Sequence, residues 1–167
     1  MDERALVRSA RAGDKAAFAQ LYIRYRDKLY RYAYFKLGSA EDAQDAVSSC
    51  ITQAYMGVAS VKNEKAFSAW LFKILYRECC AVLTKKAQLG ITVDIDDAQP
   101  QAGGDIHLAP ELEEALAQLS PEEKDIVLLS AVAGYSSPEI AAMLNLKAAT
   151  VRSKLSRSLA KMRTFLE

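Results

Sequence analysis

The sequence predicts an all-α protein of two small helical domains, and three observations support this fold class. Apolar residues recur every three or four positions through most of the 167-residue chain, which is the spacing of a helix face. Serine or aspartate precedes several of these segments, as at helix N-termini. Between the two groups of helical segments, prolines, paired glycines and acids predict a flexible acidic linker. The predicted division is a first domain over 1–86, the linker over 87–110 and a second domain over 111–167.

Charge is unevenly distributed along the chain, although the formal net charge is only +1. The first domain carries 15 Lys and Arg against 9 Asp and Glu, whereas residues 87–118 carry 7 acids and no Lys or Arg. Residues 119–167 are again basic, with 7 Lys and Arg against 5 acids. Two basic blocks beside an acidic segment favour two surfaces that face nucleic acid, joined by a tether that phosphates repel.

Composition argues against several other classes of protein. Three cysteines lack the spacing of a disulfide framework or a zinc site and are expected to be buried thiols. With one histidine and no nucleophile–base group or phosphate-binding glycine loop, the sequence predicts no catalytic residue, metal, cofactor or small-molecule substrate. Charges begin at Asp2 and no apolar run reaches membrane-spanning length, so a cytoplasmic protein without membrane insertion is expected.

The first domain is expected to contain four helices. They run over 2–12, from Asp14 to Gly38, onward from a cap at Ser39, and from after Asn63 to Lys86. The third turns Ala43, Val47, Cys50, Ile51, Ala54 and Val58 inward, and Asp45, Ser48, Ser49 and Thr52 outward. The fourth carries the apolar residues Phe67, Trp70, Leu71, Ile74, Leu75, Cys79 and Val82. Its far side carries Lys73, Tyr76, Arg77, Cys80 and Thr84, and Lys85-Lys86 end it. A helical bundle with a basic outer face follows.

The second domain shows the clearest helix signals in the chain. Ser120-Pro121 followed by Glu123 predicts a helix start, and Gly134 predicts its end. Ser136 to Glu139 opens a short helix that Asn145 ends in a left-handed turn. A third helix runs from about Lys147, with an inward face of Val151, Leu155, Leu159 and Met162. Its outer face centres on Ala149, Ser153 and Arg157, flanked by Thr150, Arg152 and Ser156.

This last helix indicates a DNA-binding helix-turn-helix. Its basic residues are Lys147, Arg152, Lys154, Arg157, Lys161 and Arg163, and no acid interrupts them before Glu167. A solvated helix face mixes charges of both signs. A short helix, a tight turn and a cationic amphipathic helix are the arrangement that places a recognition helix in the major groove.

The amino-acid sequence of the second domain resembles that of a known protein family. LSPEEKDIVLLSAVAGYSSPEIAAMLNLKAATVRSKLSRSLAKMR is similar to the promoter-recognising C-terminal domain of bacterial RNA polymerase sigma factors of the extracytoplasmic-function type. The matching parts include Gly134-Tyr135-Ser136, Glu139-Ile140-Ala141 and Thr150-Val151-Arg152-Ser153. Lys147 and Ala149 depart from the family, which usually has a small hydroxyl residue and glycine there. Because lysine cannot cap a helix as serine does, the helix start is expected to be less well fixed.

The first domain resembles the same family. LYIRYRDKLYRYAYFKLG, SAEDAQDAVSSCITQAY and AFSAWLFKIL are similar to the sigma domain that docks on polymerase and melts the promoter. Asp45 and Trp70-Leu71 match well. Ser48-Ser49 replace a usual glutamine-glutamate, Arg77 replaces asparagine and Ala81 replaces aspartate.

The resemblance implies an alternative sigma factor that binds core RNA polymerase and promoter DNA. It also implies an anti-sigma factor that binds the protein and keeps it inactive. By resemblance, the −35 element would be contacted by Lys147, Thr150, Arg152, Ser153, Lys154, Ser156 and Arg157. The −10 element would be contacted by Lys73, Tyr76, Arg77, Lys85 and Lys86, and polymerase by Asp45, Ser48, Ser49 and Thr52. Two alternatives stay open. The departures at Ser48, Ser49 and Arg77 favour a sigma mimic that binds an anti-sigma factor without promoter melting, and a dimeric helix-turn-helix transcription regulator is the other alternative.

Overall fold

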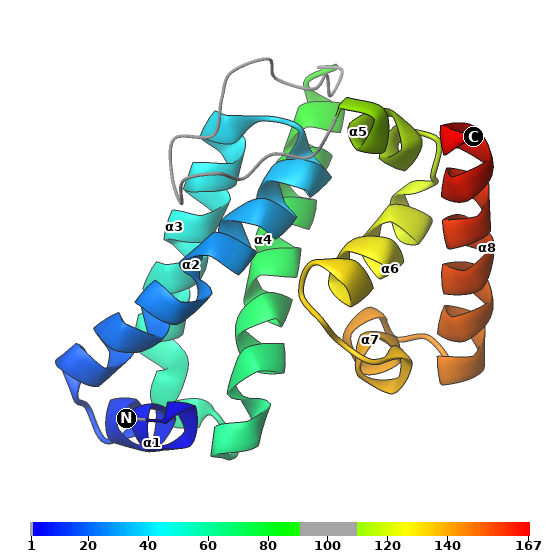
Figure 1. Ribbon diagram of the computed structural model, residues 1–167. Helices are drawn as coiled ribbons and strands as arrows, with labels where there is room; N and C mark the ends of the chain where they lie inside the picture. The colour runs from blue at the N-terminus through cyan, green and yellow to red at the C-terminus, as the bar shows by residue number, and fades with distance from the viewer. Residues whose placement is uncertain (1, 91–109) are drawn as a thin grey trace. The chain divides into compact units, whose positions relative to one another are not determined.

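The computed structural model describes residues 2–90 and 110–167, and these residues form two compact units on either side of the gap (Figure 1). Within the described residues there are eight α-helices and no strand. The predicted all-α class with two helical parts is therefore confirmed. The predicted linker over 87–110 lies outside the described residues except at its ends, where the flanking helices extend into it. No helix in the described ranges has both the length and the apolar character needed to cross a membrane.

The first unit is a bundle of three long helices with a short helix across one end (Figure 1). The elements are α1 (Glu3–Arg11), α2 (Lys15–Leu37), α3 (Ala40–Gly57) and α4 (Phe67–Gln88), with short 3₁₀ turns η1 (Val58–Ser60) and η2 (Glu64–Ala66) before α4. The side chains of Asp2, Asp14 and Ser39 cap the first three helices. Gly38 ends α2 with φ +73°, a conformation that glycine adopts without strain. The predicted boundaries are thus confirmed for α1 and α2, and the predicted start is confirmed for α3.

The core of this unit is rich in aromatic side chains from α2 and α4. Tyr32, Phe67 and Phe72 are fully buried. Phe72 meets the rings of Tyr25 and Tyr32 edge to face, with centroids 6.4 and 6.2 Å apart. The Tyr25 hydroxyl donates to Glu3 Oε1 at 2.7 Å, and burial raises the pKa of this hydroxyl. Four of the five tyrosines of α2 are therefore part of the bundle core, where each offers a large apolar body together with a polar tip.

Cys50 and Glu78 each form a hydrogen bond between α3 and α4. Cys50 and Cys79 are buried as expected, whereas Cys80 is half-buried. The Cys50 thiol donates to the Leu71 carbonyl at 3.6 Å, and burial raises its pKa to about 12. Glu78 accepts a hydrogen bond from the Gln53 amide. This bond explains why an acid is tolerated close to the apolar stripe of α4.

The second unit packs three helices against the long C-terminal one (Figure 1). Its elements are α5 (Pro110–Ala117), α6 (Pro121–Ala131), α7 (Ser137–Leu144) and α8 (Ala148–Leu166). Ser120 and Ser136 each form a capping box with the glutamate three residues later, as the sequence predicts. Asn145 ends α7 with φ +58°. The chain turns at Asn145 into α8, which completes the helix-turn-helix formed by α7 and α8.

The inward face of α8 differs from the predicted one at a single position. Val151 and Met162 are buried and Leu155 is half-buried, but Leu159 is 42% exposed. Ser158, one residue earlier, is fully buried in its place. The Ser158 hydroxyl donates to Glu123 Oε2 at 3.3 Å, so an acceptor on α6 satisfies this polar group. The prediction that Leu159 faces inward is therefore wrong.

Candidate nucleic-acid interface

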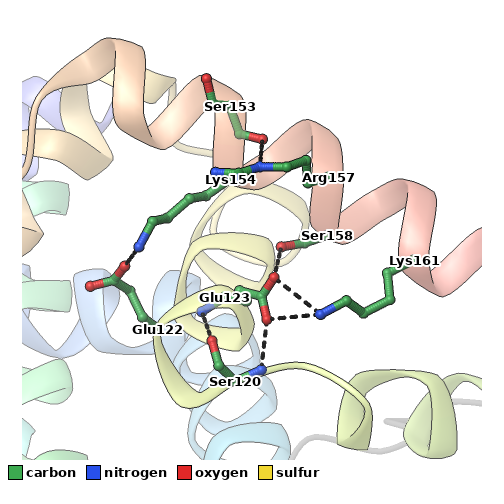
Figure 2. A network of polar contacts seen from close by, with 8 residues as sticks. All are labelled: Ser120, Glu122, Glu123, Ser153, Lys154, Arg157, Ser158 and Lys161. Atoms are coloured by element: carbon green, nitrogen blue, oxygen red, sulfur yellow. Dashed lines mark hydrogen bonds and ion pairs between the residues drawn. The ribbon is translucent and has the colours of Figure 1, made fainter.

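The exposed face of α8 carries the polar and basic residues that the sequence assigns to DNA contact. Arg152, Ser153, Ser156 and Arg157 are all exposed and line an open hollow on the surface. The Arg157 Nε donates to the carbonyl of Ser153 at 3.4 Å, which holds the guanidinium along the helix (Figure 2). Within the described part of the chain, neither Arg152 nor Arg157 forms an ion pair. Both guanidinium groups can therefore bind a base edge or a phosphate.

Lys147 and Thr150 lie at the first turn of this helix. Lys147 is the N-cap residue, is exposed and makes no side-chain cap hydrogen bond, as expected for lysine. Thr150 is half-buried. The first turn also carries the positive end of the helix dipole, and a basic N-cap residue beside it favours an anion such as a phosphate.

Lys154 and Lys161 differ from the two arginines because each is paired with a glutamate of α6 (Figure 2). Lys154 binds Glu122, and Lys161 lies 3.3 Å from Glu123 Oε1. Lys154 is the one residue assigned to the −35 contact whose charge is already partnered within the described second unit. The sequence missed both pairs because their partners lie 32 and 38 positions earlier in the chain.

Glu123 is the centre of the network in Figure 2. Its Oε1 accepts the Ser120 backbone N–H at 2.9 Å, and its own backbone N–H donates to Ser120 Oγ at 3.2 Å. The same carboxylate accepts from Ser158 and from Lys161. The Ser120 N–H, followed by the Lys161 ammonium, holds the pKa of the Glu123 carboxylate down to about 2, because each stabilises the charged form. Glu123 therefore stays ionised at any pH near neutral.

The residues assigned to the −10 contact lie along α4 in the first unit. Lys73, Arg77 and Lys85 are exposed and form no ion pair among the described residues. Tyr76 is half-buried, with the Lys36 ammonium 5.0 Å from its ring centroid. Lys86 is paired with Asp42 at the start of α3. The basic outer face of α4 thus consists of three open cations, one aromatic ring held by a lysine and one partnered lysine.

The residues assigned to polymerase binding form one face of α3. Asp45, Ser48, Ser49 and Thr52 are exposed, and the Thr52 hydroxyl donates to the Ser48 carbonyl at 3.0 Å. The same face continues into Tyr55 and Met56, which are 44% and 79% exposed. The set of residues assigned from the sequence does not include these two, although they follow Thr52 by three and four positions and so share its face of the helix.

The two units together define a class of protein: an all-helical DNA-binding protein whose C-terminal unit is a helix-turn-helix with a cationic recognition helix. Within the described residues, no group of three or more histidines, cysteines and acids is arranged to hold a metal ion.

Comparison with known proteins identifies the family. Residues 21–88 match Sigma-70 region 2, and residues 110–162 match Sigma-70, region 4. The chain is 31% identical over 157 residues to the ECF RNA polymerase sigma factor SigM of Mycobacterium tuberculosis, covering 93% of this chain and 80% of SigM. It is 25% identical over 167 residues to the ECF RNA polymerase sigma factor SigW of Bacillus subtilis, covering 90% of this chain and 89% of SigW.

Two solved structures share the fold. One is CnrH in complex with the cytosolic domain of CnrY, with a TM-score of 0.73, 23% identity, and coverage of 98% of this chain and 96% of that one. The other is the sigma factor RpoE in complex with the anti-sigma factor NepR from Bartonella quintana, with a TM-score of 0.78, 23% identity, and coverage of 89% and 96%. The chain belongs to the extracytoplasmic-function (ECF) RNA polymerase sigma factors, and it is an alternative sigma factor that directs transcription initiation.

Proposed function

We propose that α8 reads the −35 element of its promoters in the major groove, through Arg152, Ser153, Ser156 and Arg157. The observation that carries this proposal is the exposed face of α8, where two arginines without ion pairs in the described chain flank two small hydroxyl residues. An arginine can bind the O6 and N7 atoms of a guanine with two hydrogen bonds, and each such pair contributes about 1–3 kcal/mol of discrimination. The short serines let the helix backbone approach the base edges.

Lys147, Thr150 and Lys154 are proposed as the phosphate contacts around this reading face. Lys147 and Thr150 lie at the N-terminal turn, where the helix dipole also attracts an anion. Lys154 contacts a phosphate only by exchanging the Glu122 carboxylate for it, because the ammonium is already paired. Its contribution to affinity is therefore smaller than that of an open cation.

In the first unit, α4 is proposed to bind the −10 strand. Lys73, Arg77 and Lys85 supply open positive charge, and the Tyr76 ring offers a face on which a base can stack. Lys86 joins them on release from Asp42. The polar face of α3, with Asp45, Ser48, Ser49 and Thr52, is proposed to dock on core RNA polymerase, and these four residues are all exposed.

Residues 1–86 and 111–167 act as the two functional domains, joined by the acidic linker over 87–110. The protein acts by binding, without catalysis of its own, in the cytoplasm where the polymerase and the chromosome are. An anti-sigma factor is proposed as the partner that restrains it, because the similar sigma factor RpoE forms a complex with the anti-sigma factor NepR.

Run-off transcription with purified core polymerase tests this function. We expect transcripts that start at defined promoters with the protein present and none without it. Arg157→Ala should lower initiation from a promoter with the preferred −35 base about 10- to 100-fold and relax the choice of that base. Arg163→Ala is the matched control, since Arg163 is an exposed arginine about 9 Å further along the same helix. An equal loss on every −35 sequence would make Arg157 a phosphate contact instead.

A further inference from the structure

Ser158 breaks the apolar stripe by which α8 packs on α6. Its exposed fraction is 0%, equal to that of Val151 on the same stripe. Burying a hydroxyl without a hydrogen-bond partner costs about 1–3 kcal/mol in proteins. Here Glu123 Oε2 accepts the hydroxyl at 3.3 Å. The acceptor on Glu123 therefore favours the orientation of α8 in which Ser158 is buried.

Leu159 offers α8 a competing orientation. It is 42% exposed although it is the larger and more apolar of the two neighbours. At roughly 100° per residue, the stripe that contains Leu159 in place of Ser158 is centred about 25° further round the helix. Rolling a helix of about 5 Å radius by that angle moves its surface by about 2 Å. Such a shift breaks a base-edge hydrogen bond, since these bonds weaken steeply beyond their normal length.

Glu123 is fixed before it meets α8. Its carboxylate accepts the Ser120 N–H at 2.9 Å within the capping box at the start of α6, and its side chain is only 20% exposed. Lys161 approaches both carboxylate oxygens, at 3.3 and 3.4 Å. Ser158 and Lys161 lie on the same side of α8, one turn apart, so two hydrogen-bonding groups of α8 converge on one anchored acceptor.

We propose that Glu123 is a positioning residue for promoter selectivity. By accepting hydrogen bonds from Ser158 and Lys161, it sets the rotation of α8 in which Ser158 is buried and Leu159 exposed. In this rotation Ser153 lies opposite the buried stripe, with Arg152 on one side of Ser153 and Arg157 on the other. All three side chains can therefore reach the groove. The inference rests on the proposed function, because it assumes that this face reads the −35 element.

The test compares promoter selectivity, measured as the ratio of run-off transcripts from the preferred promoter and from one with a substituted −35 base. Selectivity of the Glu123→Ala holoenzyme should fall about tenfold, because the Leu159 orientation is no longer disfavoured. Adding Leu159→Gln should restore the ratio to within about twofold of the unmodified protein, because it removes the apolar group that drives the competing orientation. Glu122→Ala is the matched control: it removes a neighbouring carboxylate that does not contact Ser158, and it should leave the ratio unchanged.

The effect of Leu159→Gln distinguishes a positioning role of Glu123 from a purely structural role. Glu123→Ala and the double variant lack the same capping box, so a purely structural role predicts equal loss of selectivity in both. If Glu123→Ala does not fold, as circular dichroism would show, Glu123→Gln replaces it, because glutamine can keep the capping box while its amide group takes the place of the oxygen that accepts the Ser158 hydroxyl. It should lower the ratio about fivefold, and Leu159→Gln should again restore it. An unchanged ratio, or a loss that Leu159→Gln does not reverse, would overturn the inference. Absence of promoter-specific transcripts with the unmodified protein would instead overturn the proposed function.

Discussion

Replacing Lys154 should change the salt dependence of promoter binding much less than replacing Arg152, although both are basic residues of α8. Binding of a cation to a DNA phosphate releases counterions, and each such contact contributes about 0.9 to the slope of log K against log salt concentration. Arg152 is exposed and has no ion pair in the described chain. Lys154 is paired with Glu122, with side chains 33% and 43% exposed. A lysine that is already paired with a carboxylate of the protein neutralises little phosphate charge, so its binding to DNA releases few counterions.

The magnitudes follow from that difference. Arg152→Ala should reduce the slope by about 0.9, equivalent to about a 3.5-fold smaller loss of affinity when salt rises from about 50 to 200 mM. Lys154→Ala should reduce it by less than half as much. Glu122→Ala, which frees Lys154 for a phosphate, should increase the slope and strengthen binding on every DNA sequence. An exposed ion pair contributes about 0–1 kcal/mol to stability, so all three variants should fold.

The assay is fluorescence anisotropy of a labelled promoter duplex titrated with holoenzyme over a salt series. The core enzyme makes the same large contribution to the slope of every variant, so this contribution cancels when the slopes of two variants are compared. Equal decreases for Lys154→Ala and Arg152→Ala would refute the reasoning, because they would show that the Glu122 pair does not compete with DNA. A weaker complex with Glu122→Ala would refute it equally.

Three further predictions concern stability and docking. The lowered pKa of Glu123 contributes stability that is complete above its unfolded-state pKa near 4.5 and is lost as pH falls toward about 2. The thermal unfolding midpoint of Glu123→Gln should therefore depend less on pH over that window than the midpoint of the unmodified protein. The same pH dependence in both proteins would contradict the role of the Ser120 and Lys161 contacts. Ser136→Ala removes the capping box of α7 and should lower the free energy of unfolding by about 1 kcal/mol in urea titrations of the second unit's transition, with Ser137→Ala as the control that makes no cap bond. Asp45→Arg on the exposed face of α3 should weaken binding to core polymerase in a pull-down while leaving the thermal unfolding midpoint unchanged; a drop in that midpoint would instead indicate a structural role.

The sequence predicted the local parts of this fold because their causes lie within a few residues. The Ser120 and Ser136 capping boxes, the left-handed Asn145 and the uncapped start at Lys147 are all present. Each is decided by the chemistry of one turn. The exposed reading face of α8 was predictable for a similar reason, since a periodic apolar stripe fixes the opposite face to within one residue position.

Interactions over long sequence separations escaped the prediction. Apolar spacing ranks leucine above serine, so Leu159 was preferred to Ser158 for the inward face. The residue that reverses this preference, Glu123, lies 35 positions earlier. The pairs of Lys154 with Glu122 and of Lys86 with Asp42 likewise join different helices. Pattern reasoning finds the basic residues on a face but does not show which of them are already neutralised.

Site-specific photocrosslinking from α8 in the promoter complex measures the central claim most directly. A photoreactive amino acid replaces Ser153 or, as a control on the exposed surface of α5, Ala117. Irradiation of holoenzyme bound to a promoter duplex should crosslink position 153 to the −35 bases and leave position 117 without DNA adducts. Crosslinks from 153 to protein alone, or to DNA at no fixed distance from the transcript start, would contradict the assignment of α8 as the helix that reads the promoter.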